Sequence, residues 1–391
     1  MSESIIICIF ANQFNRKICG LLTAKITYIT MKQKYIYESE RWPNFIWDKV
    51  SLSEKQAVIT RKAGHLFGRL HDIGFDTQLR TMTENMTDSV VDSYSIEGIT
   101  LNAAQVRSSV ARRLGLDLPK HTEPSHYVDG IVEMMLDATT NYRTPLSHER
   151  LMHWHTALFP PRTSPDIIIG DYRTSAMDVI SGMLGRERVH YHAPESAAIP
   201  QMMKQFIEWY NLGSNHDYIR SAVAHLYFIS IHPFDDGNGR IARALSDMAL
   251  SQADDSPMRY FSMSSQINKE KKQYYKILER TQKSDGNISE WINWWLDCLG
   301  HAIDMSDSSL TTILRKSLFW QRNTETSITD RQRMVLNLYL DGYEGKLTVK
   351  NYAKHAEVST DTAARDIKEL IEKGILQAKG DMQRNVEYEI L

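Results

Sequence analysis

The chain has few cysteines, no long hydrophobic run and no excess of either charge. Cys8, Cys19 and Cys298 are its three cysteines; they cannot form an even set of disulfide bonds, and their spacing fits no metal site. The apolar run Ile5–Phe10 is too short to span a membrane, and it lacks the basic flank and cleavage site of a signal peptide. With 46 basic and 48 acidic residues, the composition indicates no polyanion or membrane partner. These absences favour a protein of the reducing cytoplasm.

The length of the chain predicts more than one domain. At 391 residues it exceeds the size at which a single hydrophobic core stops growing, so two or three domains are expected. Residues 1–30 are a candidate upstream extension, because Met31 is an alternative translation start. Apolar residues at helical spacing predict a helical N-terminal module over 31–115 and a largely helical core over 116–300. A linker helix over 301–326 and a further domain over 327–391 complete the expected organisation.

The stretch from His232 to Arg243, H-P-F-D-D-G-N-G-R-I-A-R, concentrates groups that handle phosphates. His232 can accept a proton near neutral pH, and the carboxylate of Asp236 suits Mg²⁺. The Gly237–Gly239 turn lets backbone N–H groups approach an anion at the start of a predicted helix. Arg240 and Arg243 share one face of that helix and can grip one polyphosphate. The alternative is a buried histidine in an ordinary helix-turn-helix, but the helical patterns on both sides of the motif favour a phosphate site.

Every fixed position of the Fic signature, H-x-F-x-[D/E]-G-N-G-R-x-x-R, is present in this stretch, and the chain therefore resembles the Fic proteins. That family usually transfers AMP from ATP to a hydroxyl group of a protein. The resemblance implies that His232 is the general base, that Asp236 holds Mg²⁺ and that Phe234 is a structural anchor. It places the glycine turn at the α- and β-phosphates and the two arginines at the β- and γ-phosphates. The ATP-binding residues so implied are Asp236, Gly237, Asn238, Gly239, Arg240, Ile241, Ala242 and Arg243.

A second pattern, upstream of the core, suggests regulation. The stretch Ser93–Gly98 fits [S/T]-x-x-x-E-[G/N], which marks an autoinhibitory helix in the Fic family, with Ser93, Glu97 and Gly98 at the fixed positions. The resemblance implies that Glu97 pairs with Arg243 and prevents that arginine from orienting the γ-phosphate. The alternative is a surface helix that Gly98 merely terminates. The complete catalytic signature favours inhibition.

Two short alternating runs, Met177–Gly182 and Val189–His192, predict a β-hairpin after the segment Gly170–Thr174. The hairpin resembles the Fic flap, which docks a target segment as an added strand and lies over the nucleotide. The resemblance implies nucleotide contacts from Val189, His190, Tyr191 and His192.

Two histidine pairs lie outside the signature. His190 and His192, two apart on a predicted strand, suggest a metal pair, but no third ligand lies nearby in the sequence, and a flap surface is favoured. His153 and His155, two apart in a predicted helix, do not face each other and are interpreted as packing or surface residues.

A helix is predicted over Lys269–Glu279, where the family places an adenine-contacting tyrosine pair. Tyr274 and Tyr275 are the candidates, although Tyr274 is equally well explained as a core residue. Gln282 stands where some relatives have a nucleotide-binding asparagine, and its longer amide can reproduce that contact.

The C-terminal sequence predicts helices over Asp330–Leu340, Thr348–His355 and Ser359–Lys373, and strands over Ile375–Gly380 and Asn385–Ile390. These elements resemble a winged helix-turn-helix, in which the recognition helix exposes Thr360, Asp361, Thr362 and Arg365. Residues 327–391 contain 10 Lys and Arg against 11 Asp and Glu, a net charge of -1. DNA binding normally depends on a basic patch, so protein docking or a homodimer contact is favoured over DNA binding.

The predicted fold class is mainly α: a Fic-type helical core with a β-hairpin flap, between a helical N-terminal module and a winged helix-turn-helix. The favoured function is an autoinhibited protein adenylyltransferase that uses ATP and Mg²⁺. Its substrates would be Tyr, Ser or Thr hydroxyls of a protein docked on the flap, including its own. The alternatives are a nucleotide-sensing DNA-binding regulator and a Fic enzyme with another phosphodiester donor. The intact base His232 favours an enzyme, and Gly239, which the family's kinases lack, favours attack at the α-phosphate.

Overall fold

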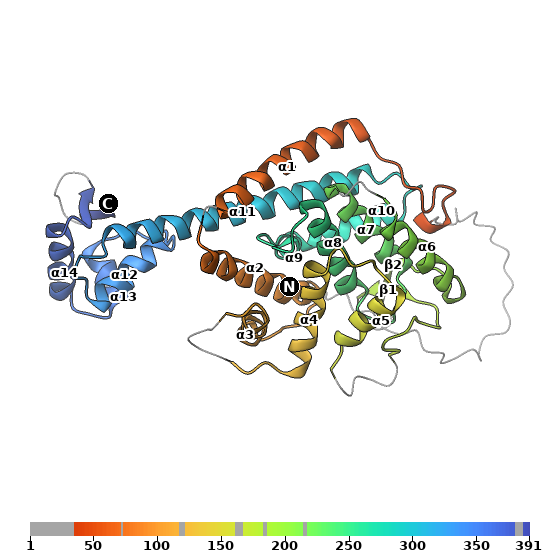
Figure 1. Ribbon diagram of the computed structural model, residues 1–391, viewed down its shortest axis with the longest axis horizontal. Helices are drawn as coiled ribbons and strands as arrows, with labels where there is room; N and C mark the ends of the chain where they lie inside the picture. The colour runs from red at the N-terminus through yellow and green to blue at the C-terminus, as the bar shows by residue number, and fades with distance from the viewer. Residues whose placement is uncertain are drawn as a thin grey trace. The chain divides into compact units, whose positions relative to one another are not determined.

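A computed structural model of the chain describes residues 35–71, 73–116, 122–160, 167–182, 186–213, 217–379 and 386–391. The candidate extension over 1–30 lies outside these residues. The chain divides into two compact units, one ending at Asp304 and the other running from Met305 to Leu391. Each unit is mainly helical, as the sequence predicted (Figure 1). Among the described residues, no helix is both long enough and apolar enough to cross a membrane.

The first unit begins with a short 3-10 helix, η1, and contains the predicted hairpin. Its elements are η1 (Ile36–Glu38), α1 (Lys49–His71), α2 (Phe75–Ile96), α3 (Ala103–Arg113), α4 (His126–Thr140), α5 (His148–Ala157), β1 (Asp178–Ser181), β2 (Arg188–His192), η2 (Ser196–Ala198), α6 (Ile199–Asn211), α7 (Tyr218–Ile231), α8 (Asn238–Asp254), α9 (Met263–Lys269), α10 (Lys271–Gln282) and the first part of α11 (Ser289–Arg322).

Helices α7 and α8 form the centre of this unit, because nearly every residue of both is buried. Helix α7 is mostly apolar, and its few polar residues lie on no single exposed face, so it is covered on all sides. Helix α7 ends at His232, whose backbone is left-handed with φ 52°, and α8 begins after Gly237, with φ 84°. The signature residues therefore form the turn between two buried helices.

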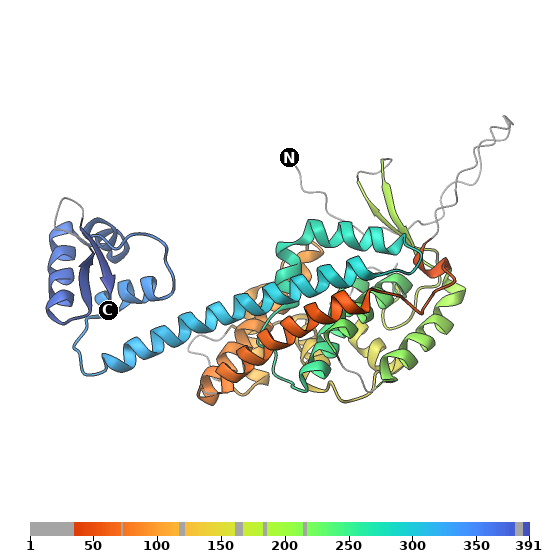
Figure 2. The ribbon, with the colours of Figure 1, turned by 90° about the horizontal axis from the view of Figure 1, so that it is seen from above.

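Strands β1 and β2 pair in antiparallel fashion, with a register shift between Val179 and Ile180. Figure 2 shows this hairpin standing at the edge of the helical unit, beside α10. At its base the ring of Tyr35 packs edge-on against that of Tyr191, with 5.2 Å between centroids. The first described residues of the chain thus cover one side of the hairpin.

The single helix predicted over Lys269–Glu279 is wrong at its start. Helix α9 ends at Lys269 and α10 begins at Lys271, with Glu270 between them at φ -100° and ψ 18°. The Glu270 carboxylate accepts hydrogen bonds from Gln266, four residues earlier, and from the indole N–H of Trp294 on α11. The break thus lies at a residue that is tied to another helix.

The second unit contains the elements predicted for the C-terminus. They are the end of α11, α12 (Asp330–Leu340), α13 (Val349–Ala356), α14 (Thr360–Glu372), β3 (Leu376–Lys379) and β4 (Glu387–Ile390), the two strands being antiparallel. Ser359 is the N-cap of α14, as predicted, and its hydroxyl accepts from the N–H of Thr362. Thr360, Asp361 and Arg365 are exposed and Thr362 is half-buried. The winged-helix assignment and the role of this face stay predictions.

Candidate active site

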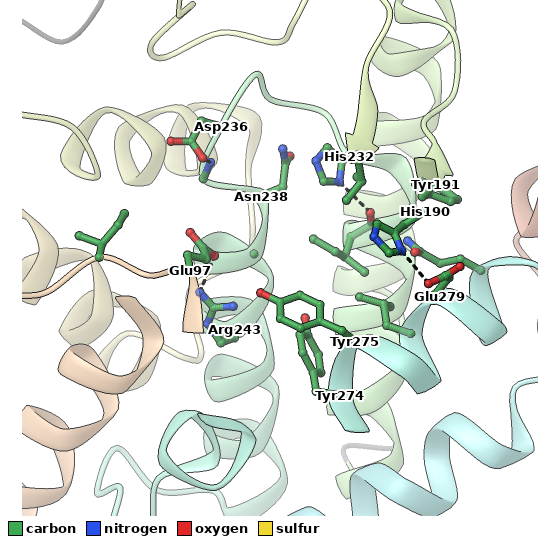
Figure 3. A pocket seen from close by; sticks show the side chains of 17 residues that line it. Glu97, His190, Tyr191, His232, Asp236, Asn238, Arg243, Tyr274, Tyr275 and Glu279 are labelled. Carbon is green, nitrogen blue, oxygen red and sulfur yellow. Dashed lines mark hydrogen bonds and ion pairs between the residues drawn. The ribbon is translucent and has the colours of Figure 1, made fainter. Parts of the chain in front are cut away.

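A cavity of about 250 Å³ lies between the signature turn, the end of α2, the hairpin and α10 (Figure 3). Its lining combines most of the residues singled out in the sequence with an apolar group from α7, α10 and the hairpin. The lining residues are Glu97, Ile99, Val179, His190, Tyr191, Ile229, His232, Asp236, Gly237, Asn238, Gly239, Arg243, Tyr274, Tyr275, Leu278, Glu279 and Gln282.

His232 presents a basic nitrogen to this cavity. Its Nδ1 lies 3.2 Å from the carbonyl oxygen of Ile229, which can only accept, so Nδ1 carries the ring proton and Nε2 is left as the acceptor. This Nε2 is buried and has no hydrogen-bond partner among the described residues. Burial lowers the pKa of His232 to about 4, so the ring is neutral at pH 7. A neutral imidazole with an unused lone pair is suited to take a proton from a hydroxyl group.

The turn that follows is held by the side chain of Asn238. Its amide oxygen accepts from the N–H of Phe234 at 2.9 Å, and its amide nitrogen donates to the Phe234 carbonyl at 2.7 Å. Gly237 is required here, because a Cβ on its left-handed backbone would meet a methyl group of Leu158 at 2.8 Å. The first N–H groups of α8 lack intrahelical acceptors, so the turn presents an anion-binding helix N-terminus to the cavity.

His155, on α5, fixes this turn from behind. Its Nδ1 accepts from the N–H of Gly170 at 3.0 Å, so its Nε2 carries the proton that is donated to the carbonyl oxygen of Asp236, also at 3.0 Å. Burial lowers the pKa of His155 to about 4, and its neutral ring stacks on Phe234 with 3.9 Å between centroids. Of the two interpretations given to His155, a packing or a surface residue, the first holds, and Phe234 is fully buried, as an anchor would be.

Asp236 reaches the cavity as a partly exposed carboxylate. One oxygen accepts from the N–H of Gly237 at 2.6 Å and the other from Nη2 of Arg240 at 2.8 Å. Each oxygen keeps a further lone pair, and hard carboxylate oxygens beside an anion site fit Mg²⁺, which binds through one or two carboxylates plus substrate phosphates. No group of three or more histidine, cysteine or carboxylate ligands occurs in the part of the chain that the structure describes.

The ion pair expected between Glu97 and Arg243 is present, and Arg240 joins it. One Glu97 oxygen lies 2.6 Å from Nη2 of Arg243, and the other lies 2.8 Å from Nε of Arg240. Arg243 also donates from Nε to the hydroxyl of Ser93 and from Nη2 to its carbonyl, both at 2.7 Å. Both guanidinium groups are buried. Burial by itself would lower the pKa of Arg240, but the carboxylates of Glu97 and Asp236 raise it above its ordinary value.

The base-binding candidates Tyr274, Tyr275 and Gln282 line the cavity from α10, with Tyr275 close to Glu97 and Arg243 (Figure 3). Tyr274 lines it but is buried, and its hydroxyl lies 2.9 Å from Nε2 of His225, so it is a core residue as well. The hydroxyl of Tyr275 donates to the carbonyl of Ile96 at 3.1 Å. Gln282 is buried, with its amide nitrogen 3.4 Å from the hydroxyl of Ser230.

The hairpin contributes His190 and Tyr191 to the cavity. Tyr191 is buried and donates to the carbonyl of Ser230 at 2.5 Å. The Nδ1 of His190 lies 2.7 Å from Glu279, whereas His192 lies 2.6 Å from Asp178. The two histidines thus have separate carboxylate partners.

Five of the predicted nucleotide contacts are not among the described residues that line the cavity: Val189, His192, Arg240, Ile241 and Ala242. Ile241 and Ala242 are fully buried in the core of α8, and the guanidinium of Arg240 lies over the ring of Tyr94 at 5.1 Å. On a helix that starts at the cavity, only the face carrying Gly239 and Arg243 reaches it, because residues four apart share a face.

Two residues of the site were not predicted from the sequence. Glu279 lines the cavity and accepts from His190, from Arg188 at 2.8 Å and from Lys283 at 2.7 Å. Those interactions lower the pKa of Glu279 to about 2, even though its burial acts in the opposite direction. Arg173, in the segment Gly170–Thr174, donates from Nε to the carbonyl of His232 at 2.8 Å. The sequence signal was its place in the segment Gly170–Thr174, four residues before a hairpin that was already expected to lie at the site.

Two family models match the chain. Residues 145–250 match the Fic/DOC family, and residues 35–116 match a domain of unknown function (DUF4172). The first segment covers the hairpin, His232 and the whole signature turn. The second covers α1, α2 and the Glu97 segment.

The chain is also similar to named proteins. It is 24% identical over 268 residues to a protein adenylyltransferase Fic of Drosophila grimshawi, covering 65% of this chain and 50% of that protein. A protein of the same name from Drosophila willistoni is 24% identical over 242 residues, covering 58% of this chain and 42% of that protein. The chain thus spans about half the length of the curated relatives it matches.

A solved structure supports the fold. The crystal structure of a Fic family protein from Desulfovibrio desulfuricans G20 superimposes with a TM-score of 0.51 at 19% identity, covering 86% of this chain and 96% of that one.

Proposed function

We propose that this chain, which carries a Fic domain, transfers AMP from ATP to a hydroxyl group of a protein. The single observation that carries the proposal is the unpartnered, buried Nε2 of His232, which faces a cavity walled by a helix N-terminus. A base without its own partner and an anion-binding turn beside it are the two groups that attack on a phosphate requires. The relatives named protein adenylyltransferase Fic support the identity of the transferred group.

The reaction follows from these positions. His232 Nε2 takes the hydroxyl proton while the hydroxyl oxygen forms a bond to the α-phosphorus of ATP. The bond from the α-phosphorus to the oxygen that bridges to the β-phosphate breaks, and pyrophosphate leaves with the electron pair. The first N–H groups of α8 stabilise the charge that develops on the α-phosphate, and Arg243 orients the γ-phosphate. Asp236 is the residue that would hold Mg²⁺, which supplies additional neutralisation of phosphate charge when it is bound.

The same geometry supports inhibition by Glu97. Its carboxylate occupies the cavity edge at Gly239, where a Cβ would lie 2.3 Å from a Glu97 oxygen. The Arg243 guanidinium is already engaged by Glu97 and Ser93, so it is unavailable to a γ-phosphate in this arrangement. A nucleotide that binds beside Glu97 lacks its orienting partner and meets a second negative charge.

We further propose that the protein substrate docks at the β1–β2 hairpin, and that the chain modifies itself when no target is present. Among the described residues β1 and β2 form a sheet of two strands, so each has an outer edge along which a further strand can pair. The C-terminal unit is a candidate for protein docking or a homodimer contact, since its recognition-helix face lacks a basic excess; DNA binding is the weaker alternative.

The test is label transfer from α-labelled ATP with Mg²⁺ to the protein itself. Wild type, Glu97→Gly and the double variant Glu97→Gly with His232→Ala are compared, with γ-labelled ATP as a parallel donor. Label from the α-position in Glu97→Gly alone is expected. Label from the γ-position would indicate phosphoryl transfer instead. No label in any variant, despite measurable ATP binding, would favour another donor or a nucleotide-sensing regulator.

A further inference from the structure

Helix α2, which carries Glu97, ends at the cavity, where side chains from α8 and α10 contact its last turn. The last four carbonyl groups of any α-helix have no intrahelical partner. In α2 these belong to Ser93, Tyr94, Ser95 and Ile96. A left-handed Gly98 closes the helix, so its N–H donates to Ser95 and the N–H of Ile99 donates to Tyr94. Gly98 therefore terminates the helix, as one interpretation predicted, and accounts for two of the four carbonyls.

The other two carbonyls accept from side chains of the nucleotide site. Arg243, the candidate γ-phosphate ligand, donates to Ser93 at 2.7 Å. Tyr275, the candidate base contact, donates to Ile96 at 3.1 Å. Lys271, one turn before Tyr275 on α10, adds a contact of 3.3 Å to Ser95. The C-terminus of α2 is thus capped by side chains from two helices at the cavity, α8 and α10.

Tyr275 contacts the backbone of Ile96, the residue immediately before Glu97, which carries the inhibitory carboxylate. Figure 3 shows the ring of Tyr275 crossing the cavity from α10, with its hydroxyl toward Glu97 and Arg243. Glu97 is the C-cap residue itself, so it has left the helical hydrogen-bond ladder, and its direction depends on how the last turn is held. Arg243 and Arg240 hold its carboxylate, while Tyr275 holds the backbone from which it projects.

We propose that Tyr275 is a positioning residue for inhibition, whose hydroxyl caps the end of α2 and keeps Glu97 on Arg243. The inference rests on the proposed function. It gives Tyr275 two roles that depend on different atoms. The ring lines the cavity where the base is proposed to bind, and the hydroxyl helps to hold Glu97 in its inhibitory position. Removing the hydroxyl weakens the hold on Glu97 and leaves the ring in place.

The arrangement also explains how a nucleotide and α2 compete. A nucleotide whose purine packs on the Tyr275 ring and whose γ-phosphate binds Arg243 contacts the same two residues that cap α2. By linkage, whatever loosens α2 raises the affinity for a productively bound nucleotide, and such a nucleotide loosens α2. Inhibition is then a competition for the two side chains, Arg243 and Tyr275, that cap α2.

The experiment compares Tyr275→Phe with wild type in the full chain, by initial rate of label incorporation from α-labelled ATP. One hydrogen bond is worth about 1 kcal/mol, so the basal rate is expected to rise about fivefold. In the Glu97→Gly background the same substitution is expected to cause no further rise in the rate, because the inhibitory carboxylate is already absent. Tyr210→Phe is the matched control, since its hydroxyl also donates to a backbone carbonyl, that of Leu245 at 2.8 Å, away from α2.

Hydrogen exchange of the Gly98 and Ile99 amides gives a readout that does not depend on catalysis. Their protection is expected to fall in Tyr275→Phe and to stay at the wild-type value in Tyr210→Phe. A wild-type basal rate with unchanged protection in Tyr275→Phe would overturn the inference, as would an equal rate increase in the Glu97→Gly background. If Glu97→Gly itself transfers no label, the proposed function fails, and the exchange comparison alone decides whether Tyr275 holds α2.

Discussion

Arg173 holds the backbone of His232, 59 residues further along the chain, through a bond of 2.8 Å from Nε to the His232 carbonyl. The same buried guanidinium donates to the carbonyls of Ser175 at 2.6 Å and Pro194 at 2.5 Å. His232 has a left-handed backbone, which a residue with a side chain adopts only when its surroundings hold it there. Arg173 thus ties the catalytic candidate to both ends of the hairpin segment.

Arg173→Lys is therefore expected to destabilise the fold and to lower transfer. A lysine ammonium keeps the charge but cannot reproduce the planar fork that reaches three carbonyls, and each buried acceptor left unpaired costs about 1–3 kcal/mol. Urea unfolding should show a loss of about 2 kcal/mol or more, and the Glu97→Gly background should show reduced label transfer. An unchanged unfolding midpoint would contradict this role.

Arg243→Ala in the Glu97→Gly background is expected to lose transfer by on the order of a hundredfold, the usual effect of removing one donor to a developing charge. ATP affinity, measured separately, distinguishes loss of orientation from loss of binding. Arg143→Ala is a suitable control, because it removes an arginine that is exposed and pairs with Asp255, away from the cavity. Retained activity in Arg243→Ala would show that another cation orients the γ-phosphate.

The rate of transfer by Glu97→Gly should change little with pH between 5.5 and 8. Burial lowers the pKa of His232 to about 4, so the base is already deprotonated across this range and the rate falls only as the pH approaches 4. A roughly tenfold fall from pH 8 to 5.5 would instead indicate a base with the ordinary histidine pKa of about 6.5.

Stability should fall as the pH is lowered from about 6.5 toward 4. Burial lowers the pKa of His155, His225 and His232 to about 4, 3 and 4. In this pH range the unfolded chain takes up protons that the folded chain does not. Each histidine therefore lowers the free energy of unfolding by about 1.4 kcal/mol for each pH unit. Burial raises the pKa of Asp247 to about 6, so its protonation has the opposite sign and offsets part of this effect. Urea midpoints at pH 7 and pH 5 test this, and a smaller pH dependence is expected for His225→Asn.

Asp236→Asn is expected to raise the Mg²⁺ concentration needed for half-maximal transfer in the Glu97→Gly background. The amide retains an oxygen ligand but loses the charge that draws the cation toward the phosphates. A metal titration of the initial rate measures the shift, and chelation of the metal is expected to stop transfer in both proteins. An identical titration curve for the two proteins would assign the cation to other ligands.

Much of the candidate site could be predicted because it is local in the sequence. Gly237 has the left-handed backbone that selects glycine, and Asn238 and Gly239 follow it directly as the first residues of α8. The hairpin and the C-terminal helices were predicted for the same reason, since alternation, apolar spacing and caps such as Ser359 act within a few residues. The Glu97–Arg243 pair was expected from family resemblance, and the distances between its atoms came from the structure.

Contacts between distant segments could not be predicted in this way. Short-range backbone preferences and residue type specify most of the helices, the turn and the chemistry of His232. The packing of the helices leaves Nε2 of His232 without a partner, places Glu97 against both Arg240 and Arg243, and keeps Arg240, Ile241 and Ala242 out of the cavity lining. It also decided that the Tyr275 hydroxyl meets the Ile96 carbonyl, 179 residues away. Such contacts depend on how whole helices pack, and the pattern of residues within one segment does not indicate which distant segment it will contact.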